Sequence, residues 1–328
     1  MSTSPRPRRR LAAGIAAFAL PATLLTACGG GDDSAEDGGL TELNIGQIPA
    51  FEAAAVYLGI EEGIFEEHGL DVTVNLAEGG AAVIPSVLSQ ENQIGYSNAV
   101  SELAAIDQGL PIRLVHSAYA QQETEEEDDY AVLVLPDSDI QGPEDLADAN
   151  IAVNTLQNLG EVTIRLALEE HGVDTDSVTW TQLNYSDMYD ALERGDVDAV
   201  WFVEPFRTPG LDRGWRNVLS SGAHSLPGQV SGYYFTSEQF NAENPEVVQA
   251  FDDAITEAID LAAENPDRVR QVAVDEFGFE EDSASRSNLP LFVNDDDLGA
   301  LETIGEASVR YGIIDEEPDY ASLFVERD

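Results

Sequence analysis

The sequence predicts an α/β fold of two similar lobes, each a mostly parallel sheet flanked by helices, with a cleft between the lobes. Short apolar strand-like segments alternate with helical segments, which is the pattern that builds parallel sheets from βαβ units. The pattern occurs twice, and strand starts near 45, 72 and 94 match in spacing those near 152, 179 and 199. About 300 residues remain after an N-terminal leader, enough for two lobes of ordinary size.

The first repeat is expected to start the first lobe. Strands are expected at 43–46, 71–74, 93–96 and 112–115, where apolar residues form short runs or alternate with polar ones. Helices are expected at 52–62, 81–88 and 100–108. The first of these helices ends near Gly63, a residue type that helix ends favour.

The second repeat follows the same scheme. Strands are expected at 130–135, 151–153, 178–180 and 198–201, and helices at 161–170 and 188–194. The chain is then expected to cross back near 224–232 and to add a strand at 232–235. Helical periodicity at 245–263, 266–277 and 298–311 predicts three more helices, which we expect to pack on the first lobe.

These elements set the expected domain limits. Lobe 1 should comprise residues 42–122 and 231–328, and lobe 2 residues 128–225, with hinges near 121–130 and 223–232. Six of the seven residues at 123–129 are acidic, which predicts a solvated, mobile loop between the lobes. A cation site in this loop stays open as an alternative, although the loop has no ligand-spacing signature.

The N-terminus predicts export. Four arginines at positions 6–10 precede an apolar stretch at 11–25, and the only cysteine, Cys28, closes the run Leu-Thr-Ala-Cys. This order is typical of a signal peptide, and the tetrad resembles a bacterial lipobox. We expect residues 1–27 to be removed, Cys28 to carry the lipid anchor, and residues 28–41 to form a flexible tether. An ordinary secretory signal with a chance cysteine is the alternative, and both the general secretory and the twin-arginine route stay open.

The composition excludes several classes of function. Without residues 1–27 the chain has 63 acidic residues against 11 of its 15 arginines, a formal charge of −52, and it has no lysine. Such a charge keeps a protein soluble and monomeric, repels nucleic acid and anionic lipid, and fits a salty medium. Without lysine the chain forms no Schiff base with pyridoxal phosphate and no phosphate-loop contact. The four histidines show no metal spacing, and no catalytic motif appears, so we expect no cofactor, no metal and no enzyme activity.

The ends of the predicted strands mark the expected ligand site. In open α/β sheets, ligands bind beyond the carboxyl ends of strands, against helix N-termini. This rule selects residues 47–51, 97–101, 154–159 and 204–208, together with nearby aromatic residues. The candidate ligand-binding residues are Gln47, Phe51, Ser97, Asn98, Tyr119, Asn154, Thr155, Gln157, Asn158, Trp201, Glu204 and Tyr234. They are mostly neutral or aromatic, which favours a small, partly apolar solute or one singly charged anion.

Several of these residues have a purely structural alternative. Asn154 and Thr155 could cap the following helix. Trp201 and its neighbour Phe202 point to opposite faces of one strand, so one of them is expected in the core and Trp201 in the cleft. Glu204 could belong to a plain turn, and Tyr96 is expected in the core.

The sequence also resembles a known family. Residues 54–72, 79–82, 97–98 with 109–111, 195–205 and 311–314 are similar to segments of the periplasmic solute-binding proteins of the nitrate, sulfonate and taurine type. That group includes binders of thiamine pyrimidine precursors. The resemblance covers about residues 43–325 and implies a type II periplasmic binding fold. It implies an extracytoplasmic protein, lipid-anchored at the cell membrane, that closes on a small solute and delivers it to an ABC permease and its ATPase.

The chain departs from this family at two places. The acidic insert 123–129 lies near the expected first hinge, and residues 92–95 replace the usual Gly-x-x-Asp pattern. Ligand identity therefore stays open between a sulfonate, taurine or nitrate-like anion and a pyrimidine-type heterocycle, with nitrate favoured least. Some proteins of this fold make the thiamine pyrimidine with a lysine-bound pyridoxal phosphate, which the lack of lysine excludes here. A sensor lipoprotein without a transporter stays open.

Overall fold

The structure is a computed structural model that describes residues 39–77, 79–295 and 298–326. The predicted signal peptide, Cys28 and the predicted tether up to residue 38 lie outside the described residues. The described part contains two five-stranded sheets flanked by helices, so the predicted α/β class is confirmed.

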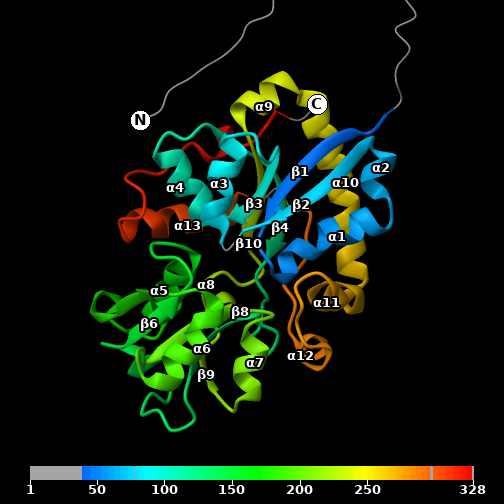
Figure 1. The fold of residues 1–328 in the computed structure, drawn as a ribbon. Helices are drawn as coiled ribbons and strands as arrows, with labels where there is room; N and C mark the ends of the chain where they lie inside the picture. The colour runs from blue at the N-terminus through cyan, green and yellow to red at the C-terminus, as the bar shows by residue number, and fades with distance from the viewer. Residues whose placement is uncertain (1–38, 78, 296–297, 327–328) are drawn as a thin grey trace, which may run out of the picture. The chain divides into compact units, whose positions relative to one another are not determined.

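The first sheet has the strand order β2-β1-β3-β10-β4 (Figure 1). Its strands are β1 (Thr41–Gln47), β2 (Leu70–Leu76), β3 (Ile94–Asn98), β4 (Ile112–Ala120) and β10 (Val230–Ser237). β1 pairs in parallel with β2 and β3, whereas β10 pairs antiparallel with β3 and β4. One strand therefore runs against the other four.

The second sheet has the order β7-β6-β8-β5-β9. Its strands are β5 (Tyr130–Val134), β6 (Asn150–Val153), β7 (Thr179–Gln182), β8 (Ala199–Val203) and β9 (Arg216–Leu219). β6 pairs in parallel with β7 and β8, and β5 is antiparallel to β8 and β9. β5 and β10 are each the first strand after a crossing between the lobes and take the same place in their sheets, so the two halves share one topology.

Helices cover both faces of the first sheet. They are the 3₁₀ helix η1 (Phe51–Ala53), α1 (Ala54–Glu61), α2 (Ile64–Glu67), α3 (Gly80–Leu88), α4 (Ala99–Asp107), α9 (Glu238–Glu243), α10 (Pro245–Glu264), α11 (Pro266–Asp275) and α13 (Gly299–Arg310). α1, α2 and α10 pack together on one side, and α3, α4 and α13 on the other (Figure 1). α10 begins with Pro245 at its first position and buries Phe251, Ile255 and Ile259 at helical spacing.

The second lobe is smaller. Its helices are α5 (Leu159–Glu170), α6 (Tyr185–Arg194), α7 (Arg207–Asp212), α8 (Ser221–Ser225) and the 3₁₀ helices η2 (Pro143–Leu146) and η3 (Thr175–Ser177). Two further short helices, α12 (Glu281–Arg286) and η4 (Tyr320–Leu323), lie near the C-terminus. No described helix is both long and apolar enough to cross a membrane.

The structure adds elements that the sequence pattern did not predict. β9, α7, α8, α9 and α12 are four to six residues long, too short for a periodic pattern to stand out. One of them, α12, contacts α7 of the second lobe. Arg286 of α12 forms a two-pronged ion pair with Asp212 of α7, at 2.7 and 2.8 Å.

The acidic run at 123–129 corrects another prediction. Residues 123–127 are exposed as expected, but Asp128 and Asp129 are buried, at 0% and 1% exposure. The carboxylate of Asp128 accepts hydrogen bonds from the backbone N–H groups of Tyr130 and Ala223, both at 2.9 Å. These donors replace the water that the charged group loses, so the end of the run can enter the interior.

Three segments pass between the lobes. Residues 121–129 join β4 to β5, and residues 220–229, which include α8, join β9 to β10. A third segment lies beside the first, because Leu291 pairs with Ala120 and the side-chain amide of Asn288 donates to the carbonyls of Glu126 and Asp128. The lobe limits and hinge positions stay predictions, since one conformation shows no movement.

Candidate functional site

A cavity lies between the two lobes, at the carboxyl ends of β1, β3, β6 and β8. In this conformation, with the lobes in contact, its volume is only about 30 Å³. It is lined by Ile48, Glu52, Gly80, Tyr96, Asn98, Tyr119, Tyr130, Asn154, Asn158, Leu159, Tyr185, Trp201 and Val203. This is the place where the topology of open α/β sheets puts a ligand.

The first lobe contributes one wall. Glu52 stands on η1 directly after β1, Tyr96 and Asn98 lie on β3, and Tyr119 lies near the end of β4. Asn98 also begins α4, because its side-chain oxygen accepts from the N–H of Ser101 at 3.0 Å. Gly80 at the start of α3 lies so close to β3 that an added Cβ would lie 2.3 Å from the hydroxyl of Ser97, which would have to move aside.

The second lobe contributes the opposite wall. Side chains alternate along β8, so Phe202 packs under α6, while Trp201 faces α5 and lines the cavity. The indole N–H of Trp201 donates to the hydroxyl of Ser221 at 3.0 Å. A Cβ on Gly160 would lie 2.9 Å from the Trp201 ring, so this glycine lets α5 approach β8. The indole is thereby fixed from two sides.

The two lobes touch at the cavity. The side-chain amide of Asn158, at the start of α5, donates to the hydroxyl of Ser101 on α4 at 2.6 Å. The hydroxyls of Tyr119 and Tyr130, which lie on either side of the first crossing, are 2.7 Å apart. The structure is therefore a conformation in which the lobes are in contact.

Burial governs the electrostatics of the cavity. Glu52 is 2% exposed, and loss of water raises its pKa to about 7. Burial also raises the pKa of Tyr96, Tyr119 and Tyr130 well above the usual tyrosine value, so their hydroxyls stay protonated. Asp129 lies behind the lining, and burial together with the nearby charge of Glu52 holds its pKa well above the usual value.

The predicted ligand residues fall into four groups. Five line the cavity: Asn98, Tyr119, Asn154, Asn158 and Trp201. Thr155 and Gln157 line a neighbouring pocket at the rim, between α3 and α4 of the first lobe and the segment before α5. Four are fully buried and do not line the cavity: Gln47, Phe51, Ser97 and Tyr234. Glu204 forms the last group alone.

The carboxylate of Glu204 is occupied by partners within the protein. It accepts from the N–H and hydroxyl of Thr208 at 3.0 and 2.6 Å, from Arg207 at 3.2 Å and from the hydroxyl of Ser287 at 3.2 Å. These bonds hold the start of α7 and the segment that leaves α12. Glu204 does not line the cavity.

One of the structural alternatives fails, and another holds only in part. The residue that begins α5 is Asn158, so neither Asn154 nor Thr155 caps that helix. Tyr96 is buried as expected, but it also lines the cavity, because a residue at the end of a central strand can belong to both the core and the cleft.

Eight lining residues are absent from the twelve candidates: Ile48, Glu52, Gly80, Tyr96, Tyr130, Leu159, Tyr185 and Val203. Three of them, Glu52, Tyr130 and Tyr185, have polar side chains and were not considered for the site at all. Glu52 is the only acidic residue between residues 48 and 60, a run that is otherwise largely apolar. An isolated acid in an apolar run could have indicated a buried, functional carboxyl group. Tyr185 follows β7, a strand to which the strand-end rule was not applied. Tyr130 stands at a lobe crossing, where no pattern marks a ligand contact.

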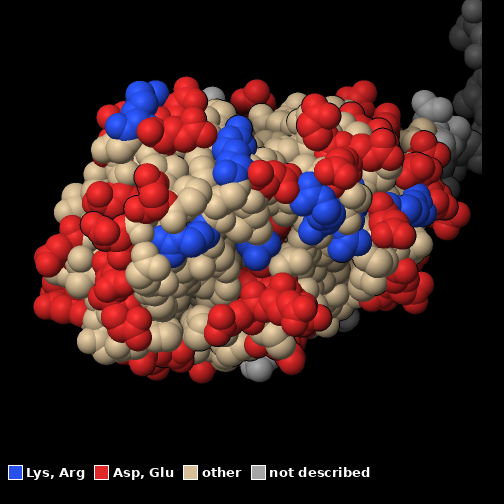
Figure 2. All heavy atoms as spheres, turned by 90° about the horizontal axis from the view of Figure 1, so that it is seen from below, with Lys and Arg blue, Asp and Glu red and all other residues tan. Residues whose placement is uncertain are grey.

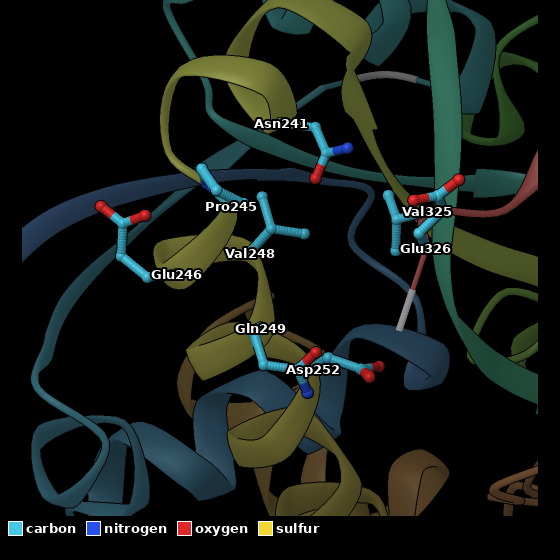
Figure 3. A pocket seen from close by; sticks show the side chains of 8 residues that line it. All are labelled: Asn241, Pro245, Glu246, Val248, Gln249, Asp252, Val325 and Glu326. Carbon is cyan, nitrogen blue, oxygen red and sulfur yellow. The ribbon is translucent and has the colours of Figure 1, made fainter. Parts of the chain in front are cut away.

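A larger hollow lies elsewhere, on the first lobe. It has about 980 Å³ of empty space, open solvent included, between α9, α10 and residues 325–326. Figure 3 shows Asn241, Val248 and Gln249 around it, with Val325 on the facing side. Its lining comes from one lobe only, so it is not the cleft that the fold creates. Within the described residues, no group of three or more His, Cys, Asp or Glu side chains could hold a metal ion.

Comparison with solved structures confirms the fold. The alkanesulfonate-binding protein SsuA from Xanthomonas axonopodis pv. citri, bound to MOPS, is 16% identical with a TM-score of 0.72, covering 88% of this chain and 99% of that one. The periplasmic aliphatic sulphonate-binding protein SsuA from Escherichia coli is 14% identical with a TM-score of 0.72, covering 87% and 97%. The periplasmic nitrate-binding protein NrtA from Synechocystis PCC 6803 is 12% identical with a TM-score of 0.72, covering 86% and 84%. The chain therefore has the two-lobed periplasmic binding protein fold.

The family follows from a separate comparison. No curated protein matches the chain. The family model described as NMT1/THI5 like matches residues 50–269, more than half of the chain, which confirms the resemblance to this group of solute-binding proteins. The chain belongs to the NMT1/THI5-like family.

Proposed function

We propose that this protein is the solute-binding component of an ABC importer, which captures a small organic solute in the cleft and passes it unchanged to a membrane permease. One observation carries the proposal: the cavity takes its lining from both lobes, with Asn98 and Tyr96 on one side and Asn158 and Trp201 on the other. A solute bound there contacts both lobes, so it favours the conformation in which they meet.

Hinge closure is the expected mechanism. Without solute, the contact between Asn158 and Ser101 should break and the lobes should separate about the connections at 121–130 and 223–232. With solute, the cavity lining closes and the same contact forms. The rim pocket, where Thr155 and Gln157 face α3 and α4, is a second place where the lobes meet on closure.

The lining supports binding without chemistry. Apart from one carboxyl group, its polar side chains are amides, tyrosine hydroxyls and an indole N–H. The tyrosines are held in the protonated form, and the lining has no histidine, cysteine or serine to form a nucleophile and base pair. Such a site orients a solute and removes water from it.

The protein should act outside the cytoplasm as a lipid-anchored monomer, with Cys28 as the anchor. The SsuA protein from Escherichia coli and the NrtA protein from Synechocystis are both described as periplasmic, which supports this location. Figure 2 shows acidic side chains over much of one face with fewer basic ones among them, in line with a chain that carries 63 acidic and 15 basic residues. A surface of this kind repels copies of itself.

The proposal is tested first by native mass spectrometry of freshly purified protein that lacks residues 1–27. A thermal-shift panel of sulfonates, nitrate, pyrimidines and flavins follows. A true solute should raise the melting temperature, because it binds the native state alone. Deletion of the gene should then reduce uptake of that solute. A solute that binds but whose uptake is unchanged would point to a sensor, and the absence of any bound compound would contradict the proposal.

A further inference from the structure

The lining of the cavity has a single charged side chain, and that charge is negative. Glu52 is almost fully buried, and its Oε2 atom has no hydrogen-bond partner among the described residues. A buried carboxylate without a partner destabilises the protein, because it has lost its hydration and no hydrogen bond or opposite charge replaces it. A missing partner for Glu52 is therefore expected in the bound state.

A second carboxyl group lies near Glu52, and burial favours its protonated form. Asp129 is 1% exposed, its Oδ1 atom also has no partner among the described residues, and its charge interacts with that of Glu52. The other titratable groups near Glu52 are the tyrosines at 96, 119, 130, 185 and 234, which are neutral. The groups that interact with Glu52 and Asp129 include no basic side chain.

The basic residues of the described chain are engaged elsewhere. Arg207 pairs with Glu204, and His116 is hydrogen-bonded to the carbonyl of Ser117 and to Thr256. Arg216 donates to two backbone carbonyls, and the remaining described arginines each have a carboxylate partner. None of them lines the cavity. Among residues 39–77, 79–295 and 298–326, no basic side chain is therefore left to pair with Glu52.

We propose that the solute carries a positively charged nitrogen, which lies against Glu52 among the aromatic rings of the cavity. Tyr96, Tyr119, Tyr130 and Trp201 supply ring faces and edges around this carboxyl group. Aromatic faces attract organic cations, and the attraction grows when water is excluded. The inference rests on the proposed function, because it names the chemical class of the solute for the same cleft.

An anion, such as the ligands named for the structural relatives, finds weaker support here. Helix N-termini are the usual anion sites, and α4 and α5 both begin at the cleft. The side chain of Asn98 already accepts from the first turn of α4. The carboxylate of Glu161, in the first turn of α5, accepts from the N–H of Gln157 at 2.6 Å and places a negative charge at that end. An anion would meet these acceptors and Glu52 together.

The test compares three probes of one shape and different charge: benzylammonium, benzyl alcohol and phenylmethanesulfonate. Each is titrated calorimetrically into solute-free protein near pH 7. We expect benzylammonium to bind at least roughly tenfold more tightly than benzyl alcohol, and phenylmethanesulfonate to bind most weakly. Titrations in two buffers of different ionisation heat should show proton release on cation binding, because burial raises the pKa of Glu52 and a bound cation favours its charged form.

Two variants complete the test. Glu52→Gln keeps the shape of the side chain and should remove both the preference for the cation and the proton release. Glu102→Gln is the matched control, since Glu102 is a buried glutamate with unpartnered oxygens that does not line the cavity, and its variant should keep both. A cation that binds no more tightly than the alcohol, including no binding by any probe, would overturn the inference. Tighter sulfonate binding with closure of the lobes would overturn it and leave the proposed function standing.

Discussion

Replacing Glu52 by glutamine should remove a specific pH dependence of stability. The carboxyl group has a pKa of about 7 in the folded protein against 4.5 for an exposed glutamate. Between these values the unfolded chain has lost the proton and the folded chain still holds it. The folded state therefore binds more protons, and its stability falls as the pH rises through this window.

The difference of the two pKa values corresponds to about 3 kcal/mol, present in full at low pH and lost above about pH 7. Glu52→Gln has no proton to lose at this position. Relative to the wild type, the variant should gain about 3 kcal/mol in free energy of unfolding between about pH 4 and pH 8. Buried acids that do not interact with Glu52, such as Asp128 with a pKa raised by burial to about 6, cancel in the comparison. Asp129 does interact with Glu52, so its pKa should fall in the variant.

Urea unfolding followed by tryptophan fluorescence measures this difference. Both solute-free proteins are unfolded at several pH values across the window, and the free energy is extrapolated to water. The Glu102→Gln variant serves as a control for the general effect of removing a buried carboxyl group. Parallel pH curves for wild type and Glu52→Gln would refute the reasoning, because they would mean that Glu52 titrates equally in the folded and unfolded states.

Three further substitutions have expected outcomes. Gly160→Val should push the Trp201 ring into the cavity and lower the free energy of unfolding by about 1–3 kcal/mol. It should also abolish the solute-induced rise in melting temperature, and a variant that still binds solute would contradict the role of Trp201 in the cavity. Asn158→Ala removes the 2.6 Å hydrogen bond to Ser101 and should weaken solute affinity about three- to tenfold by calorimetry, whereas an unchanged affinity would mean that the contact does not favour closure. Arg286→Ala breaks an exposed ion pair and should change the free energy of unfolding by no more than about 1 kcal/mol, so a larger loss would show that α12 holds the lobes together.

Periodic elements could be predicted from the sequence because each buries one face over many residues. The strands at 43–46 and 151–153 and the long helix at 245–263 coincide with β1, β6 and α10. Short elements could not, since β9 and α12 have too few residues to establish a period. Their positions depend on tertiary contacts, such as the pairing of β9 with β5.

The site was predictable where topology alone places a residue. The strand-end rule led to Asn98 and Asn158, which do line the cavity. The rule also led to Glu204, whose carboxylate accepts hydrogen bonds from Thr208 of α7. The rule gives the position of a residue, but it does not show which groups within the protein bind its side chain. Glu52 was missed for the opposite reason: one acid among 63 attracts no notice until its burial and its missing partner are seen.

The acidic composition also misled one prediction. The run of acidic residues at 123–129 predicted a solvated loop throughout. Asp128 is nevertheless buried, because its carboxylate accepts hydrogen bonds from two backbone N–H groups. Charge predicts exposure only when no donor is available inside the protein, and the donors here come from Tyr130 and from Ala223, nearly a hundred residues away in sequence.

Small-angle X-ray scattering of the protein without residues 1–27 tests the central claim most directly. The protein is measured after its solute has been stripped by unfolding and refolding, and again after the solute identified by native mass spectrometry has been restored. Closure around a shared cavity predicts a smaller radius of gyration for the loaded protein than for the solute-free protein. An identical radius with the solute fully bound would contradict the account.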